Sequence, residues 1–147
     1  MGASYALLGY FLPPLLARFR QHYPEIDLDL RDMERPDIED AVLAGDLELG
    51  LVLISNTQQR ERFNHHVLLR SRRQLWTSST HPLREQPFAS LADVAQYPDI
   101  QLAMDEGEAA TQRYWQSQGL QPNSAFRTKS MEAVRGLVAH GFGVTIL

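Results

Sequence analysis

Apolar and polar residues in the first thirty positions follow a helical period and then an alternating one. Apolar side chains recur at i, i+3, i+4 and i+7 over Leu12, Leu15, Leu16 and Phe19, the spacing that places them on one face of a helix. This pattern predicts a helix over residues 13–23, which Pro24 ends because proline lacks the N–H that a helix interior needs. Apolar and acidic residues then alternate over residues 26–30, which predicts a half-buried strand.

The rest of the first half continues this alternation of helix and strand. Acids in the first turn and a glycine at the end, Gly45, predict a short helix over residues 37–44. An unbroken apolar run predicts that residues 47–54 form a strand covered on both faces, as in a parallel sheet. Further strands are expected over residues 1–3, 63–70 and 72–78.

The second half repeats the pattern after an irregular, proline-containing connection over residues 81–90. We expect strands over residues 100–104, 125–128 and 144–147, and helices over residues 109–118 and 131–140 that stop at Gly119 and Gly141. Strands that alternate with helices form parallel sheets with right-handed crossovers, so the predicted fold class is α/β. The apolar strand over residues 144–147 has nothing after it to cover it, and we therefore expect a fold that is incomplete at the C-terminus.

Charge and composition narrow the possible functions. The chain has 147 residues, a formal net charge of -4, 18 acidic against 14 Lys and Arg residues, and no cysteine. An excess of acids argues against direct DNA binding by this segment, because affinity for DNA rests on neutralising phosphates. The absence of cysteine excludes disulfides and thiolate metal sites, and the longest apolar runs are too short to span a bilayer.

Residues that could catalyse a reaction or hold a metal do not form a recognisable group. The Gly-x-Ser-x-Gly and His-Glu-x-x-His signatures of hydrolases are absent. His65 and His66 are adjacent on an expected strand and would point to opposite faces, and His81 is expected in a turn. The acids at residues 37–40 and 105–108 stand where helix dipoles favour them and lack calcium-loop spacing. We therefore predict no catalytic residue, no metal and no cofactor.

Small polar residues and one arginine follow the expected strands or precede the expected helices. The candidates for contact with a ligand are Ser4, Arg35, Thr77, Ser78, Thr128 and Ser130. Open α/β sheets bind ligands outside the carboxyl ends of their strands, and helix N-termini present N–H groups to anions. Each residue alone also has a simpler interpretation, since Ser130 would be a good N-cap whatever the domain binds.

Four segments of the chain follow a pattern known from one family. They are residues 8–30, 40–51, 81–94 and 130–147, which include LPPLLARFR, LAGDLELG, HPL and AVRGLVAHGFGVTIL. In this order they resemble the effector-binding domain of LysR-type bacterial transcription regulators. Glu48 stands where the family has Asp, a change that keeps the negative charge.

The resemblance implies two Rossmann-like lobes of the periplasmic-binding-protein type II fold. Lobe I is then expected over residues 1-77 and lobe II over residues 78-147, joined by crossing strands near residues 72–78. The family's function implies that a small-molecule effector binds the inter-lobe cleft, where the six candidate residues would lie. Effector binding would shift an oligomer that holds DNA through an N-terminal winged helix-turn-helix, which is absent from this chain.

The sequence does not identify the effector, and one hypothesis is a small carboxylate or similar anion. If the cleft binds such a group, it would accept hydrogen bonds from the hydroxyls of Ser4 and Ser130, with positive charge from Arg35. A neutral or zwitterionic effector remains an alternative, because Glu106 and Glu108 would face the mouth of the cleft and repel an anion.

The expected assembly is a homodimer or tetramer in the cytoplasm. As the resemblance implies, the helix over residues 13–23 would pack against the helix over residues 131–140 of a partner. The apolar stripe of the first helix is too wide for one sheet face, which also predicts an interface there. We predict that the chain is not an enzyme and does not enter a membrane. A solute-binding protein of an uptake transporter shares the fold and is the alternative function, and an enzyme on the same fold ranks third.

Overall fold

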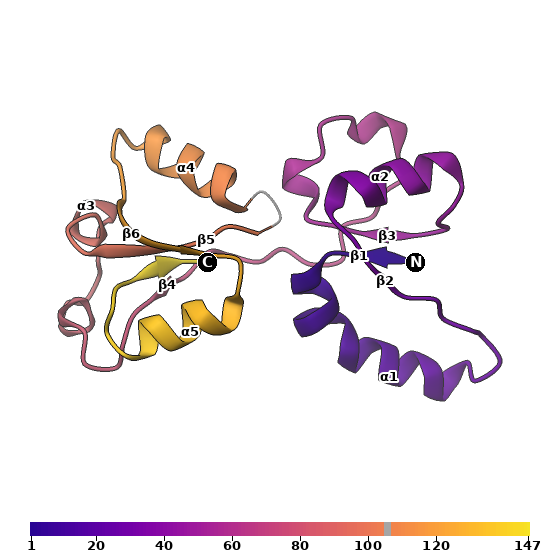
Figure 1. Ribbon diagram of the computed structural model, residues 1–147, viewed down its shortest axis with the longest axis horizontal. Helices are drawn as coiled ribbons and strands as arrows, with labels where there is room; N and C mark the ends of the chain where they lie inside the picture. The colour runs from indigo at the N-terminus through magenta and orange to yellow at the C-terminus, as the bar shows by residue number, and fades with distance from the viewer. Residues whose placement is uncertain (105–106) are drawn as a thin grey trace. The chain divides into compact units, whose positions relative to one another are not determined.

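The computed structural model describes residues 1–104 and 107–147, which form two compact units (Figure 1). Unit 1 is Met1–His66 and unit 2 is Val67–Leu147. The division falls earlier than the expected boundary between residues 77 and 78, because the strand at residues 75–76 pairs within unit 2.

Unit 1 contains a small parallel sheet. Its strands are β1 (Gly2–Ala3), β2 (Arg31–Asp32) and β3 (Gly50–Leu51), and β1 lies in the middle with β2 and β3 on either side. Parallel neighbours joined by helices are what the sequence pattern predicts for an α/β unit. The carboxyl ends of all three strands therefore lie at one edge of this sheet.

A long helical segment connects β1 to β2. The π-helical turn η1 (Leu7–Phe11) runs directly into α1 (Leu12–His22), which has proline in its first turn as expected. The strand predicted over residues 26–30 is wrong, since pairing begins only at Arg31, whose N–H donates to the Met1 carbonyl. Residues 26–30 have no strand to pair with because their neighbour, β1, is only two residues long.

The second helix of unit 1 packs closely on the sheet. α2 (Arg35–Ala44) ends at Gly45, which has the left-handed φ of 81° that favours glycine. Ile38 of α2 is 1% exposed, and a Cβ on Gly50 would lie only 2.5 Å from its Cγ2 atom. The glycine in β3 therefore allows α2 to approach the strand.

The remaining chain of unit 1 contains less strand than the sequence predicts. Of residues 47–54, only the two residues of β3 pair, and the 3-10 turns η2 (Ile54–Asn56) and η3 (Arg60–Arg62) follow. Residues 63–70 contain no strand, although a strand was predicted there. An apolar run forms a strand only where a neighbour supplies hydrogen bonds, and the run itself does not specify that neighbour.

Unit 2 contains four strands joined by parallel and antiparallel pairing. They are β4 (Leu75–Trp76), β5 (Pro98–Leu102), β6 (Asn123–Thr128) and β7 (Thr145–Ile146). β5 pairs with β6 in parallel, whereas β4 pairs with β7 in antiparallel orientation. A parallel bridge between Asp99 and Val144 connects β5 to the start of β7. The predicted helix stops are confirmed, since Gly119 and Gly141 have φ of 67° and 76°.

Helices cover both faces of these strands, and Figure 1 shows α4 and α5 on opposite sides of them. On one face α3 (Leu91–Val94) and α4 (Gly107–Ser117) pack with the 3-10 turn η4 (Pro82–Glu85). Their buried core is Leu83, Val94, Trp115 and Val144. On the other face α5 (Met131–Ala139) packs on the core formed by Ile100, Val134 and Val138.

The end of unit 2 is better covered than expected. The strand expected over residues 144–147 was predicted to lack a cover, and this prediction is wrong. Val144 is 0% and Thr145 2% exposed, because β7 lies between β4 and the bridge to β5. Asp105 and Glu106, two of the acids considered above, lie outside the described residues.

Candidate functional site

Ser4 is the strongest polar candidate in unit 1. It follows β1 directly and precedes the helical segment that leads into α1, and its carbonyl accepts the N–H of Leu8 at 2.9 Å. Ser4 is 2% exposed, and its Oγ has no hydrogen-bond partner among the residues that the structure describes. A buried hydroxyl without a partner costs free energy, on the order of 1–3 kcal/mol. Ser4 is therefore a candidate for contact with a ligand.

Thr57 is a second residue of unit 1 with a buried hydroxyl, and it is not among the candidates that the sequence predicts. It follows β3 and the η2 turn, and its Oγ1 also lacks a partner among the described residues. β1 and β3 are parallel neighbours, so Ser4 and Thr57 both come after carboxyl strand ends. The sequence feature that could have pointed to Thr57 is its position after the apolar run of residues 47–54, in a segment that reads only as a polar loop.

Arg35 lies at the start of α2 in unit 1 and is 8% exposed. Its Nη1 donates to Oε1 of Glu39, one helical turn later, at 2.8 Å. A buried guanidinium needs such a counter-charge. Part of the positive charge that the sequence assigned to a ligand is thus already neutralised within α2.

Thr128 and Ser130 form a local cap in unit 2. Thr128 ends β6, and its Oγ1 accepts the N–H of Ser130 at 3.1 Å. Ser130 is the N-cap of α5, with its Oγ accepting the N–H of Ala133 at 3.1 Å and donating to Oε2 of Glu132 at 3.2 Å. Ser130 therefore has the capping role that the sequence offered as its simpler interpretation, and any ligand at this end of unit 2 would compete with that cap.

Thr77 and Ser78 lie at the opposite end of the strands of unit 2. β5, β6 and β7 run parallel to one another, whereas β4 is antiparallel to β7. The carboxyl end of β4 therefore lies at the edge where the other three strands begin. From the strand register and spacing, Thr77 lies on the order of 15 Å from Thr128. Their polar groups are also used locally, since Thr77 donates to the Ser78 carbonyl at 3.2 Å and that carbonyl accepts the His81 N–H. The structure does not bring these two residues to the edge that holds Thr128.

Charged groups near the strand ends are mostly paired. Glu108, at the start of α4, forms an ion pair with Arg127 of β6. The repulsion that Glu108 was expected to exert on an anion is thus partly cancelled, whereas Glu106 lies outside the described residues. Among the described residues no cluster of three His, Asp or Glu side chains could hold a metal ion, and none of the described helices is both long enough and apolar enough to cross a bilayer.

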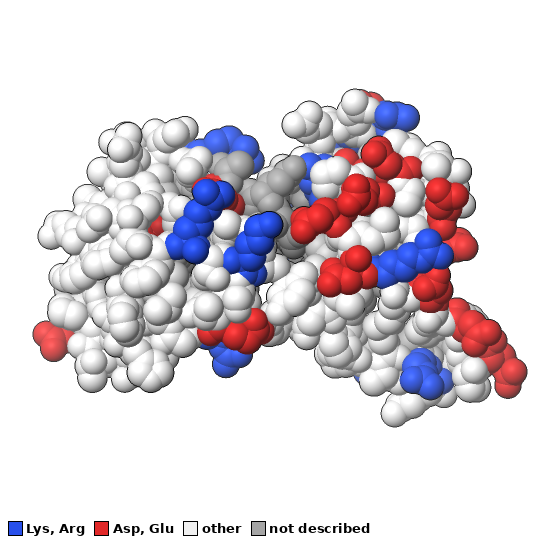
Figure 2. Space-filling view, in the orientation of Figure 1, with Lys and Arg blue, Asp and Glu red and all other residues white. Residues whose placement is uncertain are grey.

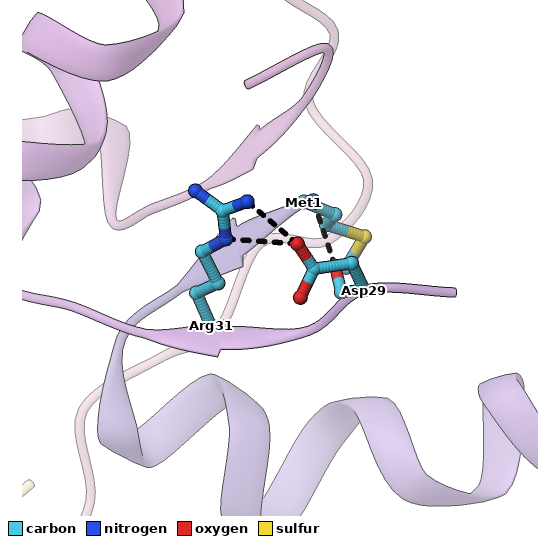
Figure 3. A network of polar contacts seen from close by, with 3 residues as sticks. All are labelled: Met1, Asp29 and Arg31. Carbon is cyan, nitrogen blue, oxygen red and sulfur yellow. Dashed lines mark hydrogen bonds and ion pairs between the residues drawn. The ribbon is translucent and has the colours of Figure 1, made fainter. Parts of the chain in front are cut away.

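The amino ends of the unit 1 strands carry a separate polar network (Figure 3). Arg31 donates from Nε and Nη2 to one carboxylate oxygen of Asp29 at 2.9 and 2.7 Å, and the Met1 amino group donates to the Asp29 carbonyl. This guanidinium holds the pKa of the Asp29 carboxyl below its usual value. The network lies at the edge of the sheet opposite to Ser4 and is not part of the candidate site.

The visible surface of unit 1 is acidic (Figure 2). Exposed acids on and around α2 include Asp37, Asp40, Asp46 and Glu48. Such a surface repels phosphate, which agrees with the prediction that this segment does not itself hold DNA.

Comparison with known proteins identifies the fold and the family. The family model described as the LysR substrate binding domain matches residues 1–147. The chain belongs to this family. It is 26% identical over 151 residues to the HTH-type transcriptional regulator CysL of Bacillus subtilis. This alignment covers 100% of the chain and 49% of CysL.

Two solved structures show the same fold. The LysR family regulator HinK of Pseudomonas aeruginosa is 26% identical, with a TM-score of 0.80 over 99% of this chain and 50% of HinK. The effector-binding domain of BenM, solved with its effector benzoate, is 19% identical, with a TM-score of 0.80 over 99% of this chain and 67% of that domain. The predicted periplasmic-binding-protein type II fold is confirmed.

The LysR family domain described here is shorter than the proteins it resembles. It spans about half the length of the curated relatives it matches, 49% of CysL and 43% of the CysB regulator of Haemophilus influenzae. What these whole proteins do therefore enters only as a proposal for this chain.

Proposed function

We propose that this LysR substrate-binding domain is the ligand-sensing part of a cytoplasmic bacterial transcription regulator. The observation that carries the proposal is the buried Ser4 Oγ, which has no partner among the described residues and precedes a helix at a carboxyl strand end. Membership of the LysR family supports it, since the curated relatives are named transcriptional regulators. For the same reason the alternative of a solute-binding protein is not favoured.

We propose a small carboxylate as the effector. A carboxylate oxygen accepts hydrogen bonds from a serine hydroxyl and from helix-start N–H groups, and the helix dipole favours a negative charge there. BenM offers a precedent, because its effector, benzoate, is a carboxylate. Ser4 and Thr57 would bind it in unit 1, and Arg35, whose guanidinium is already paired with Glu39, would be a further polar contact.

In unit 2 we propose that Thr128 and Ser130 contribute to effector contact. Their hydroxyls already form hydrogen bonds within the α5 cap. A bond to the effector would therefore be an additional one and not the first partner of an unpaired hydroxyl. Thr77 and Ser78 would have no direct part, because they lie at the other end of the strands.

The regulatory mechanism would be a shift between arrangements of an oligomer. An effector shifts such an equilibrium only by its difference in affinity for the two states. We propose a homodimer or tetramer in which α1 packs on α5 of a partner, with DNA held by a domain outside this chain. Leu15 of α1, 43% exposed, would be buried in that contact. Light scattering tests it, since Leu15→Glu should lower the mass of the assembly and Gln21→Glu, also on α1, should not.

The experiment for the ligand begins with a thermal-shift screen of the intact protein. Small carboxylates are compared with their methyl esters, because only the acids carry the charge that the site should select. A ligand at 100 times its dissociation constant should raise the free energy of unfolding by ~2.7 kcal/mol.

The first carboxylate found is then titrated by calorimetry into variants. Ser4→Ala should weaken binding by tens-fold, since a hydrogen bond to a charged group contributes roughly 1.5–3 kcal/mol. Ser78→Ala, which removes another buried serine hydroxyl but at the far edge of unit 2, is the control and should bind like wild type. Unchanged affinity in Ser4→Ala would retire the assignment.

A further inference from the structure

The core on the α3 and α4 face of unit 2 contains two titratable side chains that the proposed function does not use. His81 is 9% exposed and Asp99 4% exposed. Titratable groups that are this buried are rarely indifferent to pH, because burial disfavours the charged form of each.

The strand register places Asp99 on this face. Asp99 bridges Val144, whose side chain belongs to the core with Trp115, and directly paired residues of parallel strands point the same way. The next residue, Ile100, lies in the opposite core beneath α5. Asp99 therefore extends into an apolar core.

The surroundings of Asp99 satisfy its carboxyl only in part. Its Oδ2 has no hydrogen-bond partner among the described residues. Burial raises the pKa of Asp99 to about 6, and the Gln101 hydrogen bond opposes this rise. Trp115 adds a buried Nε1 donor on the same face, also without a described partner.

His81 is held in its neutral form by a hydrogen bond. Its Nδ1 accepts the N–H of Leu83 at 3.2 Å, which caps the η4 turn and fixes the remaining ring proton on Nε2. The ring also meets Tyr97 edge-on, with ring centroids 4.4 Å apart. A proton on Nδ1 would place two donors against each other, and burial lowers the pKa of the imidazole in the same direction.

The elements packed around this core carry other charged or titratable groups. Those on this face are Tyr97, Arg84 and Glu85 on η4, Asp93 on α3, Glu108, Arg113 and Tyr114 on α4, and Arg127 on β6; those on α5 are Glu132, Arg135 and His140. Arg127 is paired with Glu108, and Asp93 accepts from Ser90. Burial is the main cause of both shifts.

We propose that His81 and Asp99 are an opposed pair of proton-binding groups in the core of unit 2, one strengthening and the other weakening that core on acidification. The folded state holds the Asp99 proton more tightly than the unfolded state, so Asp99 favours folding as pH falls through about 6. The unfolded state holds the His81 proton more tightly, so His81 disfavours folding as pH falls below about 6.5. The two groups change the free energy of folding in opposite directions as pH falls. Their effects therefore partly cancel, which keeps this core stable over a range of pH.

Two variants separate these effects in the intact protein. Asp99→Asn keeps the shape of the carboxyl without its titration, and His81→Asn keeps an acceptor for the Leu83 N–H without a titrating ring. The folding equilibrium constant is measured by denaturant titration between pH 8 and pH 5. In wild type, Asp99 should raise the folding equilibrium constant approximately tenfold on acidification, and this rise should be missing in Asp99→Asn. His81 should lower the same constant on acidification, and this fall should be missing in His81→Asn.

Controls and a direct readout complete the test. Asp40→Asn and His66→Asn, both exposed in unit 1, should leave the profile of wild type unchanged. If a core variant does not fold, NMR titration of the wild type gives the same answer. An Asp99 carboxyl midpoint near 6 and a neutral Nε2–H tautomer of His81 at pH 7 support the proposal. Variant profiles parallel to wild type, an Asp99 midpoint near 4 or a His81 ring that titrates at or above 6.5 would overturn it.

Discussion

Unit 1 and unit 2 use the same strand–helix alternation but differ in the size of their buried cores and in how a serine at a helix start is used. Unit 2 has two buried cores, on opposite faces of its strands, and its α5 begins with a capped serine. Unit 1 has strands of two residues, and a helix start where the buried Ser4 hydroxyl has no described partner. The serine hydroxyl that is left for a ligand thus lies at the helix start of unit 1, whereas the corresponding serine of unit 2 caps its own helix.

The largest expected effect compares aromatic residues on helices of the two units. Trp115 of α4 is 1% exposed in the core of unit 2, so Trp115→Ala should lower the free energy of unfolding by about 3–5 kcal/mol. Phe19 of α1 is only half-buried and touches Tyr23 at 4.9 Å between ring centroids, so Phe19→Ala should cost less than half as much. Denaturant titration measures both, and equal losses would show that unit 1 is packed as tightly as unit 2.

A smaller effect tests how closely the chain is packed at the end of unit 2. A Cβ on Gly143 would lie 2.3 Å from the Pro98 carbonyl oxygen, so Gly143→Ala should destabilise the protein by roughly 1–3 kcal/mol. Gly136, inside α5, has open space around its Cβ position, and Gly136→Ala should stabilise by up to about 1 kcal/mol. Thermal melts of the two variants should shift in opposite directions. A shared direction would contradict the tight contact of β7 with β5.

The smallest effect sharpens the contrast between the two serines. Ser130→Ala removes an N-cap and should cost ~1 kcal/mol of stability without ligand. Ser4→Ala removes a buried hydroxyl that has no described partner, so its stability should be equal to or slightly above that of wild type. A loss of 1 kcal/mol or more in Ser4→Ala would mean that the hydroxyl already has a structural role.

Helix ends were predictable from sequence because their signals are local. Gly45, Gly119 and Gly141 all take the left-handed φ that the predicted stops require, and Ser130 caps its helix. These features depend on one residue and its immediate neighbours.

Strands and the set of site residues were less predictable because pairing is not local. Residues 26–30 and 63–70 have strand-like patterns but no partner strand. The antiparallel orientation of β4 moved Thr77 and Ser78 away from Thr128, and no nearby residue signals that orientation. The burial of Thr57 depends on contacts that the chain makes only when folded.

The central claim is that Ser4 binds the effector of this LysR family domain. A crystal structure of the intact protein with the first carboxylate found by the screen tests it most directly. The account predicts a carboxylate oxygen within hydrogen-bond distance of the Ser4 Oγ, about 2.5–3.0 Å. A well-ordered carboxylate bound elsewhere, with the Ser4 hydroxyl still unpaired, would contradict it.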